Sequence, residues 1–325
     1  MSCFSSEPLV TADSVYLGCS DIEGNFMAQW SGKFKNLIRA EEGRIFSHPL
    51  TSQGKVSWYE FDMAGVRNLF EVQEEKVQVT AIKNIGYADS FVPLSFNSWI
   101  YRSSEEGPQL WMWTEGKPSP LFTEEVAHIF PPYVDDKGGM AIKTRDLNTS
   151  ESSPDKLWAG KNELKMILED RDANPSSPYK AFRHQLAVSE GRVAVVATDD
   201  KGEVLLLLQD GSIKEVARAG KDVKSFDYFS PKMRGETLVF RGVDFENRKA
   251  LWVYKRGELS RLVTQGDVVH TDLGAARIHY HNQDSIFYGA PGIGPQGEIV
   301  QQATLTDLEH PTTLLGIGLI KFIDR

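Results

Sequence analysis

The sequence predicts an all-β fold, a single closed β-propeller of about seven four-stranded blades over residues 1–325. Three observations carry this prediction. Apolar runs of strand length alternate with polar turns along the whole chain. The pattern returns about every 45 residues, close to the length of a propeller blade. No long amphipathic helical pattern interrupts it, which excludes helix-rich alternatives such as a TIM barrel.

The repeat is clearest in two neighbouring stretches, residues 190–217 and 234–263. Each reads as a turn, an apolar strand, a polar turn and a second apolar strand, and then passes a glycine turn into a third strand. The turn residue before the first of these strands serves as an anchor, with equivalents at Asp13, Gly54, Asn97, Gly138, Gly191, Gly235 and Asp284. The predicted blades are residues 3–40, 43–83, 86–124, 126–170, 179–219, 223–264 and 273–318, and residues 319–325 are a candidate closing strand.

One further extended segment precedes each anchor and is predicted to be the innermost strand of its blade. Several of these segments carry proline near their end, which suits a strand at a sheet edge. The segments are residues 4–9, 44–50, 88–94, 127–133, 181–186, 225–231 and 276–281.

The composition is that of a soluble globular chain with a core, at 41% hydrophobic and 25% charged residues. A net charge of -9 argues against nucleic acid as a partner, because such binding depends on Lys and Arg neutralising phosphates. Local basic groups are interleaved with acidic residues and are interpreted as solvated surface. They are Lys33 with Lys35, and Arg234, Arg241, Arg248 and Lys249.

The two cysteines, Cys3 and Cys19, give no disulfide framework and no cysteine metal site. They would pair if they lay on neighbouring strands of one blade, but two buried thiols are the favoured interpretation. No apolar run is long enough for a membrane span, and the first residues lack the features of a secretory leader. We therefore expect a protein that is cytoplasmic by default and secreted if a leader has been removed. We also expect a monomer.

A repeat resemblance supports the fold. The segment Gly235–Gly242, followed by residues 250–253 and 259–263, resembles tandem-repeat β-propeller proteins whose repeats read N-x-x-G-x-x-A-F. More distantly, the chain resembles WD40-like and TolB-like propellers. The resemblance implies a propeller and assigns little chemistry.

Candidate functional residues gather on the predicted inner strands, which converge on the mouth of a propeller channel. His279 and His281 stand two residues apart on one strand and therefore face the same side, with Asp284 nearby, as a chelate or an acid–base pair requires. A polar lining of the channel is the favoured interpretation of these histidines. Two ligands are too few for a metal site, so we expect no metal and no cofactor.

Other polar inner-strand residues complete the candidate site. Arg183 suits a carboxylate ligand, and Tyr228 suits a general base, so both join His279 and His281 as catalytic candidates. The candidate ligand-binding residues are His48, Asp89, His184, Asp227, Arg277 and Asp284. The seven tryptophans recur in blade strands and are interpreted as core between blades.

These residues lead to two functional hypotheses. The favoured one is a non-enzymatic propeller that binds a partner protein or a glycan at the channel mouth. The alternative is a carbohydrate-active enzyme, a polysaccharide lyase or a glycoside hydrolase, since His, Tyr and Arg on the inner strands resemble the active faces of propeller polysaccharide lyases.

Overall fold

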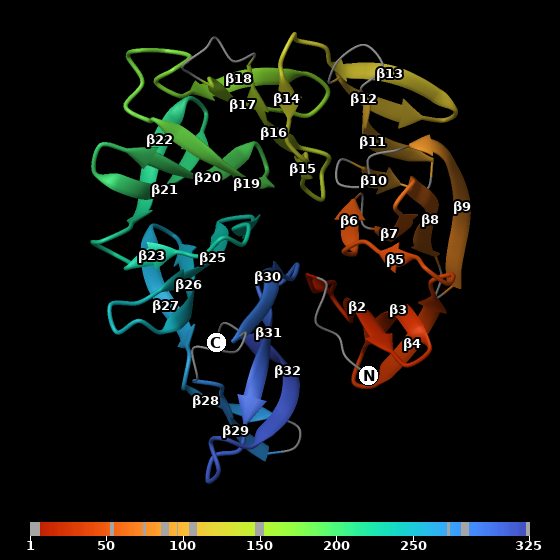
Figure 1. The fold of residues 1–325 in the computed structure, drawn as a ribbon, viewed down its shortest axis with the longest axis vertical. Helices are drawn as coiled ribbons and strands as arrows, with labels where there is room; N and C mark the ends of the chain where they lie inside the picture. The colour runs from red at the N-terminus through yellow and green to blue at the C-terminus, as the bar shows by residue number, and fades with distance from the viewer. Residues whose placement is uncertain are drawn as a thin grey trace. The chain divides into compact units, whose positions relative to one another are not determined.

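A computed structural model describes residues 7–52, 55–73, 76–85, 91–95, 97–103, 109–146, 153–271, 274–280 and 286–322. In these ranges the regular elements are β-strands, which form seven antiparallel sheets of four or five strands each (Figure 1). The fold class is a seven-bladed β-propeller. The all-β prediction is confirmed, and the resemblance to propeller proteins is confirmed at the level of the fold. Within the described ranges there is no helix long and apolar enough to span a membrane.

The blades fall into two compact units. One unit comprises Met1–Ala40 with Ala217–Arg325 and holds the first, sixth and seventh blades; the other comprises Glu41–Val216 and holds the second to fifth blades.

The first unit contains three sheets. The first blade has β1 (Leu9–Val10), β2 (Val15–Asp21), β3 (Gly24–Trp30) and β4 (Phe34–Arg39). The sixth has β23 (Ser225–Phe226), β24 (Lys232–Arg234), β25 (Thr237–Val243), β26 (Lys249–Lys255) and β27 (Glu258–Thr264). The seventh has β28 (Val268–Thr271), β29 (Gly274–Ile278), β30 (Phe287–Ile293), β31 (Ile299–Thr306) and β32 (Leu314–Phe322).

The second unit contains four sheets. The second blade has β5 (Ile45–Phe46), β6 (Leu50–Ser52), β7 (Lys55–Asp62), β8 (Gly65–Gln73) and β9 (Lys76–Ile85). The third has β10 (Val92–Ser95), β11 (Ser98–Ser103), β12 (Gln109–Thr114) and β13 (Lys117–Phe122). The fourth has β14 (His128–Ile129), β15 (Tyr133–Val134), β16 (Met140–Arg145), β17 (Asp155–Gly160) and β18 (Leu164–Glu169). The fifth has β19 (Ala181–Ser189), β20 (Arg192–Asp199), β21 (Gly202–Gln209) and β22 (Ser212–Arg218).

Several hairpins close through a two-residue turn whose second residue is glycine. In the turn between β26 and β27, Arg256 has φ 51° and Gly257 has φ 89°. Two successive residues in the left-handed region give the type I′ turn, whose twist matches that of the flanking strands. The same combination recurs at residues 115–116, 190–191 and 210–211. This local turn chemistry explains why the hairpins are visible in the sequence.

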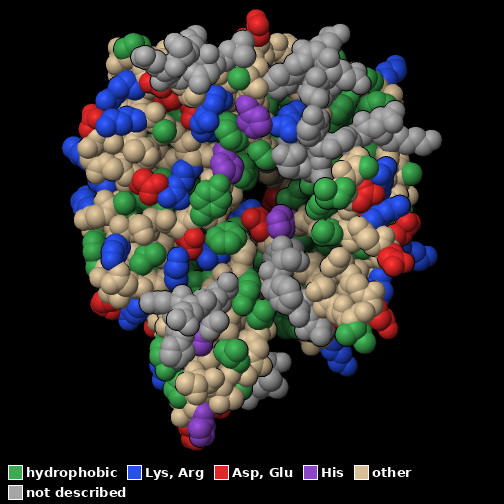
Figure 2. Space-filling view, in the orientation of Figure 1, with side chains coloured by type: hydrophobic (Ala, Val, Ile, Leu, Met, Phe, Trp, Pro, Cys, Tyr) green, Lys and Arg blue, Asp and Glu red, His purple; other side chains and the backbone are tan. Residues whose placement is uncertain are grey.

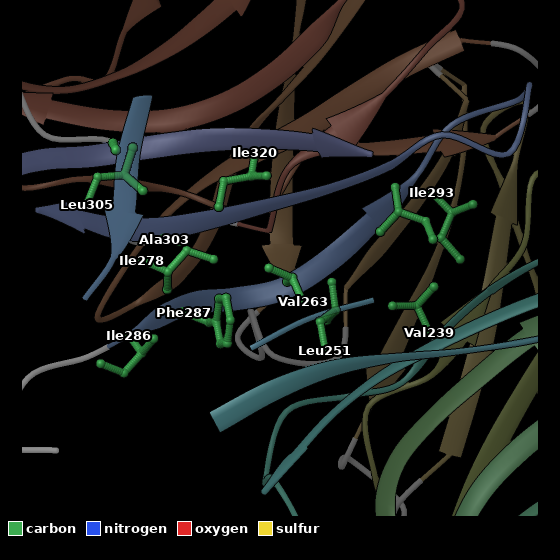
Figure 3. Close-up of a cluster of buried hydrophobic side chains, with 12 residues drawn as sticks. Val239, Leu251, Val263, Ile278, Ile286, Phe287, Ile293, Ala303, Leu305 and Ile320 are labelled. Atoms are coloured by element: carbon green, nitrogen blue, oxygen red, sulfur yellow. The ribbon is translucent and has the colours of Figure 1, made fainter. Parts of the chain in front are cut away.

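The hydrophobic core consists of separate layers between neighbouring blades. In the first unit, Val239, Leu251 and Val263 of the sixth blade pack against residues of the seventh such as Phe287 and Leu305 (Figure 3). A second layer in that unit joins Val300 of the seventh blade to β1, β2 and β3 of the first. In the second unit, one such layer joins the fourth and fifth blades. Each blade is therefore stabilised mainly by its neighbours.

The inner strand of several blades is interrupted at the same place. In four blades, a residue at this place donates its backbone N–H to a carbonyl of the second strand over 2.8–3.0 Å. The donor and acceptor residues are Ser47 and Tyr59, Phe130 and Lys143, Asp227 and Arg241, and His279 and Thr304. Beyond this bond, the inner strand of the second, fourth and sixth blades leaves the sheet for a few residues and then pairs again, as in β14 and β15. The outward segments of the fourth and sixth blades, residues 130–132 and 227–231, carry Phe130, Asp227 and Phe229 of the candidate site.

The seventh blade differs from the arrangement that the sequence predicts. Besides the bond from His279, the N–H of Thr304 donates to Ile286 over 3.0 Å. Because the N–H and C=O of one residue point to the same edge of an antiparallel strand, β29 and β30 both lie on one edge of β31, and β32 lies on the other. Residues 287–293 therefore continue the inner strand instead of forming the second. The prediction differed because the sequence pattern shows the alternation of a strand but not which neighbour the strand pairs with.

Three sequence interpretations can be compared with burial. Lys33 and Lys35 are exposed as expected, whereas Arg241 is only 6% exposed, so its assignment to solvated surface was wrong. Trp58 and Trp99 are buried, in agreement with a core role. Cys19 is buried in β2 and is not a free thiol, contrary to the favoured interpretation, while Cys3 lies outside the described residues.

Candidate functional site

Two aromatic clusters stand out, one in each unit. The histidine–phenylalanine cluster of the second unit comprises His128, Phe130, Lys143 and His184. The ring of Phe130 stacks on the ring of His184, with centroids 5.5 Å apart and planes at 14°. The Phe130 ring also contacts the ring of His128 edge to face, with centroids 4.6 Å apart. His128 is exposed, and Phe130 and His184 are half-buried, so solvent reaches this cluster.

Beneath the cluster lies a buried ion pair. The Lys143 ammonium group lies 4.6 Å from the centroid of the Phe130 ring and 2.6 Å from a carboxylate oxygen of Asp155. It also donates a hydrogen bond to the carbonyl of Phe182 over 2.6 Å, which connects the fourth blade to the fifth. The side chains of Lys143 and Asp155 are 3% and 2% exposed. Arg145 donates to the other Asp155 oxygen over 2.8 Å and completes the group.

The surroundings set the protonation of this cluster. Burial lowers the pKa of Lys143, and Asp155 opposes that shift. Burial also lowers the pKa of His184 from 6.5, and the positive charge of Lys143 and the neighbouring His128 add to the effect. A neutral imidazole has one donor nitrogen and one acceptor nitrogen, so His184 at neutral pH is suited to hydrogen bonding with an amide.

The arginine cluster of the first unit comprises Asp227, Phe229, Arg241, Lys249 and Phe287. Arg241 donates to an Asp227 oxygen over 2.9 Å and to the carbonyl of Gly289 over 2.6 Å. Its guanidinium carbon lies 4.0 Å from the centroid of the Phe229 ring. The pair is buried, with side chains 6% and 12% exposed. The sixth blade thus repeats the arrangement of the fourth, with a buried cation on the second strand beside an aromatic ring of the interrupted inner strand.

Charge balance inside the arginine cluster keeps both partners ionised. Burial acts to raise the pKa of Asp227, but Arg241 and Lys249 outweigh it and the pKa lies below its ordinary value. Burial lowers the pKa of Arg241, and Asp227 opposes the shift. Next to this pair, Tyr228 and Phe229 present exposed rings, 67% and 42% exposed. Figure 2 shows histidine and hydrophobic side chains at the surface of the face drawn.

Chemically, both clusters offer flat aromatic surfaces above a buried cation that is paired with a carboxylate. Such a surface suits a ligand with apolar groups that pack on the rings and amide groups that hydrogen-bond beside them. Among the described residues, His, Cys, Asp and Glu form no group of three or more that would hold a metal ion.

The described residues of the predicted site lie on several different blades of the two units. His279 is buried against β31, while His281 and Asp284 lie outside the described residues, as does Asp89. Arg183 forms an ion pair with Glu203 over 2.5 Å. Arg277 donates to the carbonyl of Gly266 over 2.8 Å, and His48 is exposed on the outward segment of the second blade.

The remaining predicted residues fall into the two clusters: His184 lies in one, Asp227 lies in the other, and Tyr228 lies beside it. Sequence reasoning missed Phe130, Lys143, Phe229 and Phe287 as site residues and misassigned Arg241. One signal was available. Lys143 directly follows the apolar run Met140–Ile142 in β16, and Arg241 follows the apolar run Leu238–Phe240 in β25. A charge in such a position is buried only with a partner.

Comparison with known proteins places the fold beside those of several peptidases. No protein-family model matches the chain, and no curated protein matches it. A prolyl endopeptidase structure, from a study of inter-domain dynamics in catalysis and specificity, superposes with a TM-score of 0.57 at 11% identity, covering 99% of this chain and 50% of that one. The acylaminoacyl peptidase of Pyrococcus horikoshii gives 0.57 at 12% identity, covering 92% and 50%. A puromycin hydrolase gives 0.56 at 12%, with the same coverage.

At these identities the likeness establishes the fold, and the chain spans about half the length of the solved chains it matches. The comparison also corrects the functional expectation. The sequence favoured a non-enzymatic binder of a protein or glycan, with a carbohydrate-active enzyme as the alternative. Several structural neighbours are peptidases, and this finding contradicts the non-enzymatic binder. A xyloglucanase from Xanthomonas campestris superposes with a TM-score of 0.55 at 12% identity, covering 98% of this chain and 51% of that one.

Proposed function

We propose that this chain is the propeller part of a peptidase and that its histidine–phenylalanine cluster holds the peptide substrate. The observation that carries the proposal is the position of Phe130, whose ring contacts His128 and His184 above the neutralised pair of Lys143 and Asp155. The chain serves hydrolysis by positioning a peptide, and bond cleavage belongs to another part of the assembly.

A peptide fits this surface chemically. Its apolar side chains pack on the Phe130 ring, and its amides hydrogen-bond with His128 and with the neutral His184. A polyanionic ligand fits poorly, because the chain as a whole carries a charge of -9. The arginine cluster supports the same ligand class, since Tyr228 and Phe229 are exposed above an equally balanced pair.

The comparisons support the proposal in two ways. Several of the neighbours are peptidases, and each of these peptidases is about twice as long as the part that this fold matches. This length suits a peptidase in which the propeller binds the substrate and another part of the protein cleaves it. Because fold alone does not determine function, the ligand class follows from the chemistry of the cluster and not from the likeness.

The experiment compares ligand classes. The full chain is incubated with a mixture of unstructured peptides and, separately, with neutral oligosaccharides, and bound molecules are identified by mass spectrometry after rapid gel filtration. We expect retention of peptides that contain apolar residues and no retention of oligosaccharides. Retention of oligosaccharides alone, or of neither class at millimolar ligand, would refute the proposal.

A further inference from the structure

We propose that Arg145 makes the histidine–phenylalanine cluster selective for peptides that carry a carboxylate beside an apolar side chain. The proposal rests on the proposed function, because it names the class of peptide that the cluster binds. It gives Arg145 a second role besides its ion pair with Asp155.

The first observation is how Arg145 uses its hydrogen-bond donors. Its Nε donates to one Asp155 oxygen over 2.8 Å and its Nη2 donates to the other over 3.2 Å, so Asp155 occupies one side of the guanidinium group. Among the described residues, Nη1 has no hydrogen-bond partner. Because a guanidinium group has five N–H donors, both N–H groups of Nη1 and the second one of Nη2 remain for a ligand. A second carboxylate can bind end-on to Nη1 and Nη2 while Asp155 keeps its place.

The second observation is that Arg145 is the accessible cation of the cluster. Its side chain is 41% exposed, whereas that of Lys143 is 3% exposed. The Lys143 ammonium group is also occupied, since it donates to the carbonyl of Phe182 and pairs with Asp155. The two acidic groups below, Asp155 and its neighbour Asp170, are both buried. A ligand at this surface therefore meets the positive charge of Arg145 and not the buried carboxylates.

The third observation is the position of the guanidinium group beside the aromatic surface. The guanidinium carbon of Arg145 lies 5.6 Å from the centroid of the Phe130 ring. Arg145 pairs with His128 across β16 and β14, and the His128 ring contacts Phe130 edge to face. An extended chain spans roughly 3.5 Å per residue. A carboxylate on the residue that packs on the Phe130 ring, or on the next one, is therefore within reach of Arg145.

The ion pair with Asp155 prepares Arg145 for this role. Two hydrogen bonds to a carboxylate that is only 2% exposed hold the plane of the guanidinium group in place, so little side-chain freedom is lost when a ligand binds. The hydrogen bond from Arg145 to Asp155 also raises the pKa of Arg145 above its ordinary value. Arg145 is therefore charged and oriented before a ligand arrives, and charge-assisted bidentate pairs are among the stronger hydrogen bonds.

A peptide has two sources of such a carboxylate, its C-terminus and the side chain of an aspartate or glutamate. Both offer Arg145 the same two oxygens, so the chemistry of recognition is shared. The experiment below separates the two sources.

The test compares three peptides by fluorescence anisotropy, each labelled at its N-terminus and titrated with the full chain. The first ends in Ala-Phe with a free carboxylate, the second is its C-terminal amide, and the third is the amide with glutamate in place of the alanine. The variants are Arg145→Gln and the matched control Arg171→Gln, which alters an arginine that is 37% exposed and paired with Asp200. The ratio of two dissociation constants measured on one protein sample does not depend on the fraction that is folded.

We expect the wild type and Arg171→Gln to bind a carboxylate-bearing peptide at least about fivefold more tightly than the plain amide. For Arg145→Gln we expect a ratio near one. A gain for the free acid identifies the C-terminus as the source of the carboxylate, and a gain for the glutamate peptide identifies the side chain.

Equal binding of all three peptides by the wild type would overturn the selectivity and leave the proposed function in place, whereas binding of none would overturn both. A ratio that Arg145→Gln preserves, or that Arg171→Gln also abolishes, would overturn the role of Arg145. If Arg145→Gln does not fold, Arg145→Lys decides. It keeps a cation for Asp155 but lacks the planar fork, so we expect a ratio below about twofold, and an unchanged ratio would contradict the proposal.

Discussion

Phe130 and Lys143 are coupled in two ways: the Phe130 N–H donates to the Lys143 carbonyl over 3.0 Å, and the Lys143 ammonium group lies 4.6 Å from the Phe130 ring centroid. The backbone bond fixes the start of the outward segment, and the side-chain contact fixes the ring above the cation. In the sixth blade, Asp227 makes the equivalent backbone bond to Arg241, and Phe229 supplies the ring. The recurrence in two blades indicates that a buried cation shapes each aromatic surface.

Replacing the buried cation of the fourth blade tests its structural role. Lys143→Met leaves Asp155 buried with Arg145 as its remaining cationic partner, and breaking a buried pair costs about 3–5 kcal/mol. We expect a loss in the free energy of unfolding of at least about 2 kcal/mol, since Arg145 retains part of the compensation. Chemical denaturation measures it. The control, Lys165→Met on the exposed face of β18, is expected to change stability by less than about 0.5 kcal/mol. Equal effects would contradict the account.

The lowered pKa of His184 predicts a pH dependence of stability. The unfolded imidazole, with a pKa near 6.5, binds a proton more readily than the folded one, so the stabilising contribution is complete above that value and is lost as pH falls through the folded pKa. We expect the wild type to lose stability on acidification below about pH 6.5, and His184→Gln to lose less. The exposed His310 serves as the control, because His310→Gln should retain the wild-type dependence.

The same cluster allows a spectroscopic test. Because the charge of Lys143 contributes to the lowered pKa of His184, Lys143→Met should raise that pKa toward its ordinary value. The His184 ring signals, followed by NMR between pH 4 and pH 8, report it directly. An unchanged titration midpoint in the variant would show that the charge of Lys143 does not contribute to the lowered pKa of His184.

Acid should weaken the contribution of Asp227. Its folded pKa lies below the ordinary value, so the contribution is complete above the unfolded pKa of about 3.9 and is lost as pH falls through the folded pKa. At pH 7 we expect Asp227→Asn to destabilise the chain by about 3 kcal/mol, because Arg241 stays buried. The difference from wild type should shrink below about pH 4. Asp210→Asn, at an exposed turn, should show neither effect.

The hairpins and the blade repeat were predictable because they are local. A residue followed by glycine in the left-handed region, as at Arg256 and Gly257, marks a turn that the sequence displays directly. Alternating apolar residues then indicate the strands on either side. The offset in the seventh blade was not predictable, because residues 287–293 and 299–306 have the same alternation whether they form the second and third strands or the inner and second ones.

The candidate site depended on contacts between blades, which a single sequence does not display. Lys143 bonds to Phe182, 39 positions away, and Arg241 to Gly289, 48 positions away. Arg241 stands among other basic residues in the sequence, and its burial follows only from the packing of the seventh blade against the sixth. The expectation that polar site residues lie on the inner strands nevertheless singled out His184, which is in β19, and Asp227, which begins the outward segment of the sixth blade.

The most direct test of the central claim is the effect of Phe130→Ala on peptide affinity, measured by fluorescence anisotropy with a labelled peptide selected from the retained mixture. Removing the ring eliminates the stack with His184 and the apolar contact with the peptide, worth about 1 kcal/mol or more. The account predicts at least about fivefold weaker binding for Phe130→Ala, and unchanged binding for Phe34→Ala on the exposed outer strand β4. Equal affinity for wild type and Phe130→Ala, with both proteins folded, would contradict it.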